Sequence, residues 1–373
     1  MDFTFSEEQD AVRDLAAQVF AGHAPVERVR EVERSDERVD RDLWRALADA
    51  GLLAIAVPEE YGGSGLGLIE LALVLEQQGR HVAPVPLWPT LVLGALPLAE
   101  FGTRAQREAW LPGVATGDVV LTAALAEPGA NDPLRPSVAA IADHRGGWRL
   151  DGFKVSVPAA HVADRVLVPA VVPDGATALF LVDPAGTGVD RVVAETTDRS
   201  LVAHLTFTGA PGEQLGDGAD AGRALSWTVD RAFVGLAALQ AGVAEAALRL
   251  AADYTSQRHQ FGKPLSTFQG VALKAADAYI DTEAMRVTLW QAAWRLTAGL
   301  DATREVLVAK WWASEGGQRA VHITQHLHGG MGADIDYPVH RYFLWGKQIE
   351  DTLGGASAQL ARLGTTLKEY APA

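Results

Sequence analysis

The chain has 373 residues, of which 47 are acidic and 32 basic, so its formal net charge is −15. That length exceeds what one compact core usually spans, and the acidity argues against nucleic acid as a partner, because phosphate binding needs clustered Lys and Arg. The chain contains no cysteine, which excludes a disulfide framework, a thiolate metal site and a cysteine nucleophile.

The N-terminal stretch "MDFTFSEEQD" is acidic and lacks the basic and then apolar pattern of a signal peptide. The best candidate for a membrane span is "VPLWPTLVLGALPLAEF", residues 85–101. It is interrupted by prolines and is too short, because a bilayer requires ~20 apolar residues. We therefore expect a soluble, cytoplasmic protein without a membrane span.

Residues 1–118 have the pattern of a helical domain. Ser6 followed by Gln9 has the spacing of a capping box, and apolar residues recur behind it at helical intervals. A second helix, "DRDLWRALADAG", is expected to end at Gly51, because glycine readily adopts the left-handed conformation that terminates helices. A third and more apolar helix is predicted over residues 68–81.

Residues 119–220 change character. Short runs rich in β-branched residues are separated by Gly, Pro and Asp at regular intervals, which is typical of a β-sandwich or a β-barrel. Within "WRLDGFKVSV", Asp151 and Gly152 have the composition of a two-residue hairpin turn. We therefore predict a small β domain with a hairpin at this point.

Residues 221–373 return to long helical patterns. Three apolar-periodic segments end near Gln260, Gly299 and Gly330, and a fourth fills the C-terminal part. Four long helices with short links predict an up-down four-helix bundle. The predicted class is α+β, with a helical domain, a β domain and a helical bundle in that order.

Four motifs occur along this plan: "VPEEYGG", "AEPGA", "RHQFGKPLSTFQ" and "HLHGGMGADIDYPVHRY". Together with the domain order they resemble the acyl-CoA dehydrogenase family, and "HLHGGMG" and "LGGASAQL" are most similar to its actinobacterial steroid-CoA subclass, which includes heteromeric α2β2 enzymes. The resemblance implies FAD-dependent α,β-desaturation of an acyl-CoA thioester, with a carboxylate as base. It further implies an electron-transferring flavoprotein as the electron acceptor.

The resemblance implies that FAD lies across a subunit interface, with the flavin in one subunit and the pyrophosphate and adenosine against the neighbour's bundle. Arg258 matches the family's pyrophosphate-binding arginine, whose guanidinium forks onto phosphate oxygens. Phe261 is expected to pack against the cofactor, and Gln269 to hydrogen-bond it. On local features alone, Arg258 could equally be a solvated cation at a helix end, which the helix dipole favours. The resemblance also assigns to the cofactor site Gly329, Gly330, Leu125, Ser357 and His326, which stands where the family has glutamine.

The segments that meet the flavin in the family are altered here. The family's "TEPGxGSD" stretch reads "AEPGANDP", with Ala126 at the threonine and Asp132 at the serine. Its "WITN" stretch corresponds to "KVSVPAA", with Ser156 at the tryptophan and Pro158 at the threonine. Proline lacks the N–H that could bond a flavin carbonyl, and an acidic Asp132 near a pyrophosphate would be repulsive. Ordinary drift is the alternative explanation.

The family's catalytic glutamate is also missing from its usual position. Alignment from "GGMG" places Leu353 there, and alignment from "QLARL" places Gly355 there. A minority of the family carries the glutamate on the first bundle helix before an arginine, and here that pair is Asp230 and Arg231. Aspartate is one methylene shorter, and a base must come within ~3 Å of its proton or act through a water. Asp230 is therefore either a base with reduced reach or a helix-surface carboxylate paired with an arginine.

Three hypotheses follow. In the first, the chain is one subunit of a heteromeric enzyme and completes the FAD site of a paralogous partner. In the second, it is a self-sufficient homo-oligomeric acyl-CoA dehydrogenase with Asp230 as base. In the third, it is a flavin-free structural homologue. The resemblance suggests a bulky acyl group such as a steroid side-chain CoA, with a branched or medium-chain acyl-CoA as the alternative.

Overall fold

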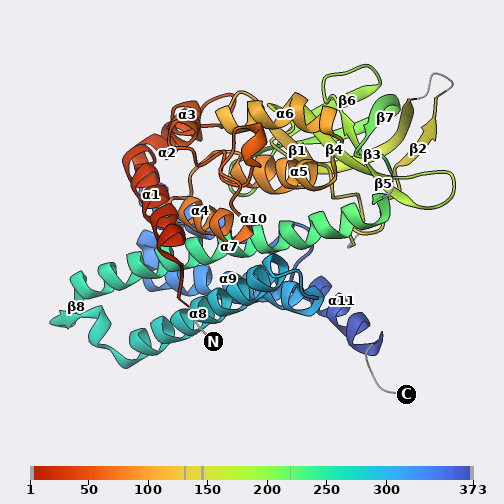
Figure 1. Cartoon of the computed structure of the whole chain (residues 1–373). Helices are drawn as coiled ribbons and strands as arrows, with labels where there is room; N and C mark the ends of the chain where they lie inside the picture. Colours follow the sequence, from red (N-terminus) through yellow and green to blue (C-terminus); the bar gives the residue numbers. More distant parts are fainter. Residues whose placement is uncertain (1–3, 130–131, 144–146, 219, 370–373) are drawn as a thin grey trace. The chain divides into compact units, whose positions relative to one another are not determined.

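The structure is a computed structural model of the chain, and it describes residues 4–129, 132–143, 147–218 and 220–369 (Figure 1). The chain forms two compact units. A helical unit contains Met1–Val29, Ala72–Ala83 and Phe233–Ala373, and a barrel unit contains Arg30–Leu71 and Pro84–Ala232. Both units are therefore assembled from separate stretches of the chain.

Helices in the first third begin and end where local signals place them. Ser6 caps α1 (Glu7–His23), and its capping box with Gln9 is formed in both directions, as predicted. Helix α3 ends before Gly51, whose φ of +74° confirms the predicted glycine stop. The other elements before the sheet are α2 (Val26–Val32), α3 (Arg41–Asp49), η1 (Glu59–Tyr61), α4 (Leu68–His81), η2 (Trp88–Ala95), α5 (Leu96–Phe101) and α6 (Arg104–Thr116).

The β domain is a closed barrel. Pairing runs β4-β2-β3-β7-β5, and β5 pairs back with β4, so the ladder closes on itself. Strand β1 pairs with β4, and β6 pairs with β7. Inward-facing apolar side chains such as Leu150 and Phe180 fill the interior. The strands are β1 (Leu121–Ala123), β2 (Ala139–Ala142), β3 (Trp148–Pro158), β4 (Arg165–Val171), β5 (Thr177–Val182), β6 (Val189–Glu195) and β7 (Leu201–Gln214).

The predicted hairpin at Asp151 and Gly152 is wrong. Strand β3 continues through both residues and pairs with β7 on either side of a register shift between Leu150 and Gly152. Gly152 has a φ of +145°, and an added Cβ would lie 2.9 Å from a side-chain carbon of Val138. The Asp-Gly pair thus forms a β-bulge, because a bulge and a tight turn both need a residue that tolerates positive φ.

Helices α4 and α7 cross at very close range in the helical unit. A Cβ added to Gly79 would lie 2.1 Å from the Leu239 carbonyl oxygen, and one added to Gly242 would lie 2.0 Å from the Glu76 carbonyl oxygen.

The elements from α7 onward are α7 (Ala221–Gln257), β8 (His259–Gln260), β9 (Lys263–Pro264), η3 (Leu265–Thr267), α8 (Gln269–Thr297), α9 (Thr303–Leu327), η4 (Gly329–Ala333), α10 (Val339–Asp351) and α11 (Ala356–Glu369).

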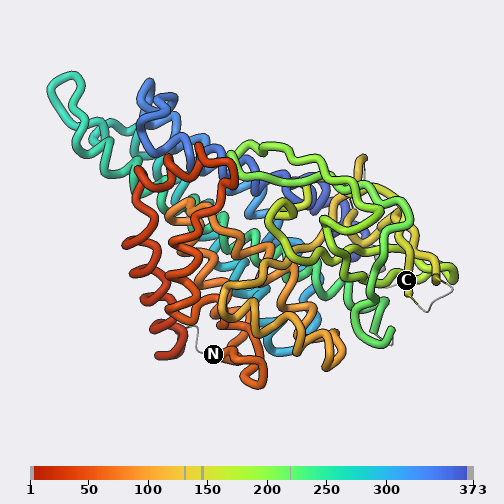
Figure 2. Tube along the Cα trace, turned by 90° about the horizontal axis from the view of Figure 1, so that it is seen from above, coloured from red at the N-terminus to blue at the C-terminus, as the bar shows by residue number. Residues whose placement is uncertain are grey.

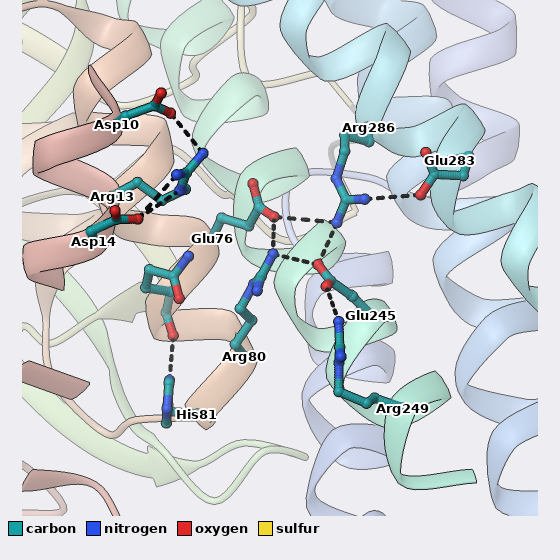
Figure 3. A network of polar contacts seen from close by, with 11 residues as sticks. Asp10, Arg13, Asp14, Glu76, Arg80, His81, Glu245, Arg249, Glu283 and Arg286 are labelled. Atoms are coloured by element: carbon teal, nitrogen blue, oxygen red, sulfur yellow. Dashed lines mark hydrogen bonds and ion pairs between the residues drawn. The ribbon is translucent and has the colours of Figure 1, made fainter. Parts of the chain in front are cut away.

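A network of two arginines and two glutamates joins α4, α7 and α8 (Figure 3). Arg80 bonds Glu76 at 2.9 Å and Glu245 at 2.5 Å, and Arg286 on α8 bonds the same two carboxylates. The four side chains are buried or half-buried, and each arginine pairs with both glutamates. Rotation of any of the three helices about its axis would break these ion pairs, so the network fixes which face of each helix points inward.

The C-terminal part of the bundle differs from the prediction in one respect. The segment expected to be a fourth long helix is two helices, α10 and α11, separated at residues 352–355. Leu353 and Gly354 there have positive φ values of +59° and +96°, which end α10.

In the part of the chain that the structure describes, one helix has the length and composition of a membrane span, and it is α7 rather than residues 85–101. Of its most apolar window, 72% is buried inside the structure, as in the core helix of a folded domain. The stretch at residues 85–101 forms η2 and α5 and is also largely buried.

Candidate functional site

The stretch "RHQFGKPLSTFQ" forms a hairpin between α7 and α8 (Figure 1). Strands β8 and β9 pair His259 with Pro264 and Gln260 with Lys263, so Phe261 and Gly262 are the two turn residues. Both have positive φ, +52° and +78°, as a type I′ turn requires. A phenylalanine in this conformation is strained, and its ring is 92% exposed. Among the residues that the structure describes, its ring contact is an edge-to-face one with Phe268 at 6.2 Å, which leaves most of the Phe261 ring open to solvent.

The hairpin presents cations to the start of α8. The exposed Arg258 guanidinium makes no hydrogen bond or ion pair with any residue that the structure describes, and Lys263 lies 4.4 Å from the Phe268 ring centre. Gln269 is the first residue of α8, and no side chain caps that end of the helix. The first backbone N–H groups of a helix are unpaired and attract anions. The arrangement can therefore hold a phosphate group.

An aromatic cluster brings the "HLHGG" motif to this hairpin. Tyr254 lies one turn before Arg258, whose N–H donates to the Tyr254 carbonyl, and its ring stacks on His328 at 4.8 Å. Tyr337 packs against both rings. Burial lowers the pKa of His328, and its Nδ1 lies 2.7 Å from the Thr324 carbonyl.

Gly329 and Gly330 follow His328 directly and are exposed. Gly329 needs its φ of +58°, but the φ of Gly330 is not positive, and a Cβ added there meets nothing within 4 Å. Neither its backbone conformation nor packing against the described residues requires a glycine at position 330, so the space beside it is open for another molecule. His326 is likewise exposed on the last turn of α9.

The predicted cofactor residues do not all lie in one place within this chain. Ser357 lies in the first turn of α11, and α11 and the β8–β9 hairpin are at opposite ends of the helical unit (Figures 1 and 2). Leu125 belongs to the barrel unit, where it is buried just after β1. Within the helical unit, Arg258 and Ser357 therefore lie far apart, one at each end.

The strand end that corresponds to the family's flavin contact is closed by hydrogen bonds of its own. Val155 donates its N–H to the Ala126 carbonyl at 3.0 Å, and Ser156 donates its N–H to Nδ1 of His204 at 3.2 Å. Pro158 has no N–H, and its carbonyl accepts from the Thr122 hydroxyl at 2.7 Å. The backbone donors at residues 155 and 156 are therefore already used.

The "AEPG" turn is held by a buried ion pair that sequence analysis missed. Glu127 accepts from Lys154 Nζ at 2.5 Å and from the N–H and hydroxyl of Ser137. Burial acts to raise the pKa of Glu127, but the bonds from Lys154 and Ser137 outweigh it and hold the pKa below its usual range. Burial lowers the pKa of Lys154 against the opposing effect of Glu127. Asp132 nearby accepts from Leu134 N–H, and residues 130–131 of the motif lie outside the described part.

The loop between α10 and α11 contains no carboxylate at the positions aligned with the family's base. Gln359 donates to the carbonyls of Leu353 at 3.3 Å and Gly354 at 2.9 Å, which fixes the loop. Glu350, just before it, is paired with Lys347 at 2.5 Å. The loop is ordered by its own contacts and offers no group that could accept a proton from a substrate carbon.

Lys310 fastens the end of α10 from inside the bundle. Its Nζ donates to Ser314 Oγ at 2.8 Å, to the Ile349 carbonyl at 3.2 Å and to the Glu350 carbonyl at 3.1 Å. Burial lowers the pKa of Lys310 to about 7, although the charges of Asp351 and Glu350 act to raise it.

This burial predicts a pH-dependent stability. Because Lys310 has a lower pKa when folded, the unfolded chain binds more protons between about pH 7 and about pH 10.4. The free energy of unfolding should therefore rise with pH in that window, by up to about 1.4 kcal/mol per unit, and this gain is lost as the pH falls towards 7. Urea denaturation at several pH values should show the full rise in wild type and in Lys274→Met, an exposed control, and a smaller rise in Lys310→Met, where the buried Lys154 still contributes. Parallel profiles for wild type and Lys310→Met would contradict the assignment.

Asp230 lies half-buried on α7 beside Arg231. The Arg231 guanidinium stacks 3.4 Å from the Trp227 ring centre and donates to the Trp227 carbonyl. Burial lowers the pKa of Arg231 to about 10, and the Asp230 charge acts against that shift.

Comparisons with known proteins agree with this architecture. The profile of the acyl-CoA dehydrogenase N-terminal domain matches residues 6–118, and that of the C-terminal domain matches residues 222–363. Acyl-CoA dehydrogenase FadE27 of Mycobacterium tuberculosis is 39% identical, over 99% of both chains. A solved structure of a variant of the Tcur3481-Tcur3483 steroid ACAD is 52% identical, covers 97% of this chain and 98% of its own, and has a TM-score of 0.92. The ChsE4-ChsE5 complex from M. tuberculosis is 39% identical over 100% of both chains, with a TM-score of 0.93.

Proposed function

Because this chain belongs to the acyl-CoA dehydrogenase family, we propose that it is one subunit of a heteromeric acyl-CoA dehydrogenase and completes the FAD site of a paralogous partner. Members of the family are FAD-dependent oxidoreductases that act on CH–CH bonds of acyl-CoA thioesters. The prediction of the fold is confirmed by the two matching domains and the barrel between them.

One asymmetry carries the proposal. The Arg258 end of the helical unit leaves groups exposed: a guanidinium without a partner among the described residues, the largely exposed ring of Phe261, and the open space beside Gly330. At the strand end the Ser156 N–H is already bonded to His204, and Pro158 has no N–H, so neither residue can donate a backbone hydrogen bond to a flavin. This pattern is expected of a chain that contributes residues to the FAD site of its partner but does not bind a flavin ring in its own barrel.

The Arg258 end fits the pyrophosphate and adenosine of FAD. Arg258 would fork onto phosphate oxygens, the start of α8 at Gln269 would add backbone N–H groups, and Phe261 would cover an apolar part of the cofactor. Gly329 and Gly330 would allow close approach of the adenosine, with His326 donating one hydrogen bond. When bound, FAD supplies the two-electron redox chemistry, and the residues of this chain bind and orient it.

The closed strand end does not fit a flavin ring of this chain's own, so the partner would supply the base and most flavin contacts. Leu125 and Ser357 would at most border that second half-site. Asp230 as base in a self-sufficient homo-oligomer is the second candidate, which the retained Asp230–Arg231 pair on α7 favours.

The acyl group is proposed to be bulky, such as a steroid side-chain CoA, since the 52% identical structure is named a steroid ACAD. An electron-transferring flavoprotein is the proposed acceptor. A structure named as such a flavoprotein from Acidaminococcus fermentans shows 27% identity over 98% of this chain.

Flavin content separates the three hypotheses. The chain is expected to purify colourless alone and with FAD absorbance when co-expressed with its paralogue, and Asp230→Asn in the pair should leave turnover within about twofold. Bound flavin and acyl-CoA turnover by the chain alone would refute the partner hypothesis. If co-expression also yields no flavin, the flavin-free homologue is correct.

Gly330→Ala tests the open space beside that glycine. The lone chain should be as stable as wild type, because its φ suits alanine and no atom within the chain is displaced. In the co-expressed pair, the added Cβ should weaken FAD binding about tenfold, as a misfit of about 1.4 kcal/mol would. Gly22→Ala in α1, where a Cβ also meets nothing within 4 Å, is the control and should leave FAD binding unchanged. Equal FAD affinity in both variants would exclude close approach at Gly330.

A further inference from the structure

Three rings from separate parts of the helical unit meet beside the Arg258 hairpin. Tyr254 comes from α7, His328 from the end of α9, and Tyr337 from the segment before α10. Between ring centres, Tyr254 lies 4.8 Å from His328, and Tyr337 lies 5.2 Å from His328 and 6.3 Å from Tyr254. Each ring therefore contacts the other two, and together they are the aromatic cluster.

On one side, the aromatic cluster is tied to the hairpin through the backbone. The Tyr254 carbonyl accepts from the Arg258 N–H at 2.8 Å. The Arg258 carbonyl in turn accepts from the Leu265 N–H at 2.9 Å, which closes the hairpin behind the arginine. A shift of Tyr254 would therefore displace the backbone from which the Arg258 guanidinium extends.

On the other side, His328 leads directly into the glycine turn η4. That turn is packed tightly against α9, because a Cβ added to Gly332 would lie 2.5 Å from the Gln325 carbonyl oxygen. Gly329 and Gly330 are the first two residues of the turn. The contact between the rings of Tyr254 and His328 thus links this turn to the hairpin.

Stability alone does not explain a histidine at position 328. The side chain is buried, and its Nδ1 donates to the Thr324 carbonyl at 2.7 Å. Nε2 is buried without a hydrogen bond to the described residues, and the nearby Leu250 carbonyl is an acceptor too, so a neutral imidazole can bond only one of the two carbonyls. A buried polar atom without a partner costs stability, and phenylalanine would stack without that cost. The imidazole adds the bond to Thr324, which fixes the plane of the ring against Tyr254.

We propose that Tyr254, His328 and Tyr337 are positioning residues, which hold the Arg258 hairpin and the Gly329–Gly330 turn in the arrangement that FAD requires before the cofactor binds. This proposal rests on the function proposed above and adds residues that act on the cofactor only through others. The measured affinity is the intrinsic affinity multiplied by the fraction of molecules in the competent arrangement. If loss of the ring contact leaves about a tenth of the molecules in that arrangement, FAD binds about tenfold more weakly.

The test is His328→Leu, which removes both the ring and the bond to Thr324, in the chain co-expressed with its paralogue. Titration of the flavin-stripped pair should show about tenfold weaker FAD binding. In the lone chain, hydrogen exchange at the Leu265 amide should become faster by the same factor, because the hairpin opens more often. His328→Phe retains the ring without the bond, and it should recover part of the FAD affinity with a thermal midpoint no lower than that of wild type.

Tyr254→Leu removes the same contact from the hairpin side, where the ring is only half-buried, and it decides the question if His328→Leu does not fold. Because both residues act through one contact, the double variant should bind FAD no more weakly than either single variant. The control is Trp311→Leu, which removes another half-buried ring from α9, ~25 Å before His328 along the helix. It should leave FAD affinity and Leu265 exchange unchanged.

FAD binding as tight as wild type in Tyr254→Leu and His328→Leu would overturn the proposal. A loss of FAD that Trp311→Leu reproduces would also overturn it, because the cause would then be general destabilisation of the bundle. Arg258→Ala keeps the two proposals apart. Weak FAD binding in Arg258→Ala with tight binding in His328→Leu removes the positioning role alone, whereas tight binding in both removes the hairpin from the cofactor site.

Discussion

Replacement of Arg258 by alanine is expected to strip most of the FAD from the co-expressed pair while leaving the lone chain as stable as wild type. The guanidinium makes no bond within the described part of the chain, so its removal costs the fold nothing that the structure shows. A hydrogen bond to a charged group contributes about 1.5–3 kcal/mol, which corresponds to about a 10- to 100-fold weaker affinity for FAD.

The measurement is the flavin-to-protein absorbance ratio of the purified pair, followed by titration with FAD. Arg104→Ala removes another exposed cation, which is paired with Glu108 in the next turn, and should keep full flavin occupancy. Arg258→Lys should recover part of the affinity, because lysine retains the charge without the forked geometry. Full occupancy in Arg258→Ala would remove the hairpin from the cofactor site.

Lys154→Met should produce the largest loss of stability, about 3–5 kcal/mol, because it leaves the Glu127 carboxylate buried without its cation. Lys154 is fully buried and its Nζ lies 2.5 Å from Glu127 Oε1, so no solvent is positioned to replace it. Urea denaturation of the lone chain measures the effect. The "AEPG" turn should open with it, since Glu127 joins that turn to β3 and to Ser137.

Two further variants identify the cause of that loss. Glu127→Gln combined with Lys154→Met removes both charges and should recover part of the stability, because the unpaired charge is the main cost. Arg13→Ala, which breaks an exposed pair with Asp10, should cost no more than about 1 kcal/mol. If Lys154→Met costs as little as Arg13→Ala, the buried pair does not stabilise the barrel.

Local signals in the sequence predicted the elements well where neighbouring residues alone decide. The capping box at Ser6 and the stop at Gly51 depend on contacts within one turn of helix, and both are present. The Asp151–Gly152 turn failed because the same dipeptide suits a bulge, and only the pairing of β3 with β7 decides between them. The Gly354–Gly355 pair is a signal for the break at residues 352–355. Because apolar residues on both sides of the pair continue the helical period, the sequence nevertheless predicted one helix.

Sequence motifs predicted the residues of the candidate site, but they did not predict the long-range contacts around it. The Arg258 hairpin was identified from its residues, but its turn type depends on the pairing of β8 with β9. The ion pair of Lys154 with Glu127 joins residues 27 positions apart, and nothing in the sequence couples them. The bonds that close the strand end at Ser156 involve His204, which lies on another strand. Long-range pairing of this kind is a property of the closed barrel.

The hairpin and the α10–α11 loop lie at opposite ends of the helical unit, and this separation has an evolutionary consequence. If each end serves a different cofactor, selection acts on them independently. A gene duplicate could then lose the carboxylate at Leu353 or Gly355 without penalty, provided that its Arg258 end still served its sister chain. Divergence of this kind makes each gene indispensable to the other, because neither product retains a whole site. A pair of genes in that position is expected to be inherited, and lost, together.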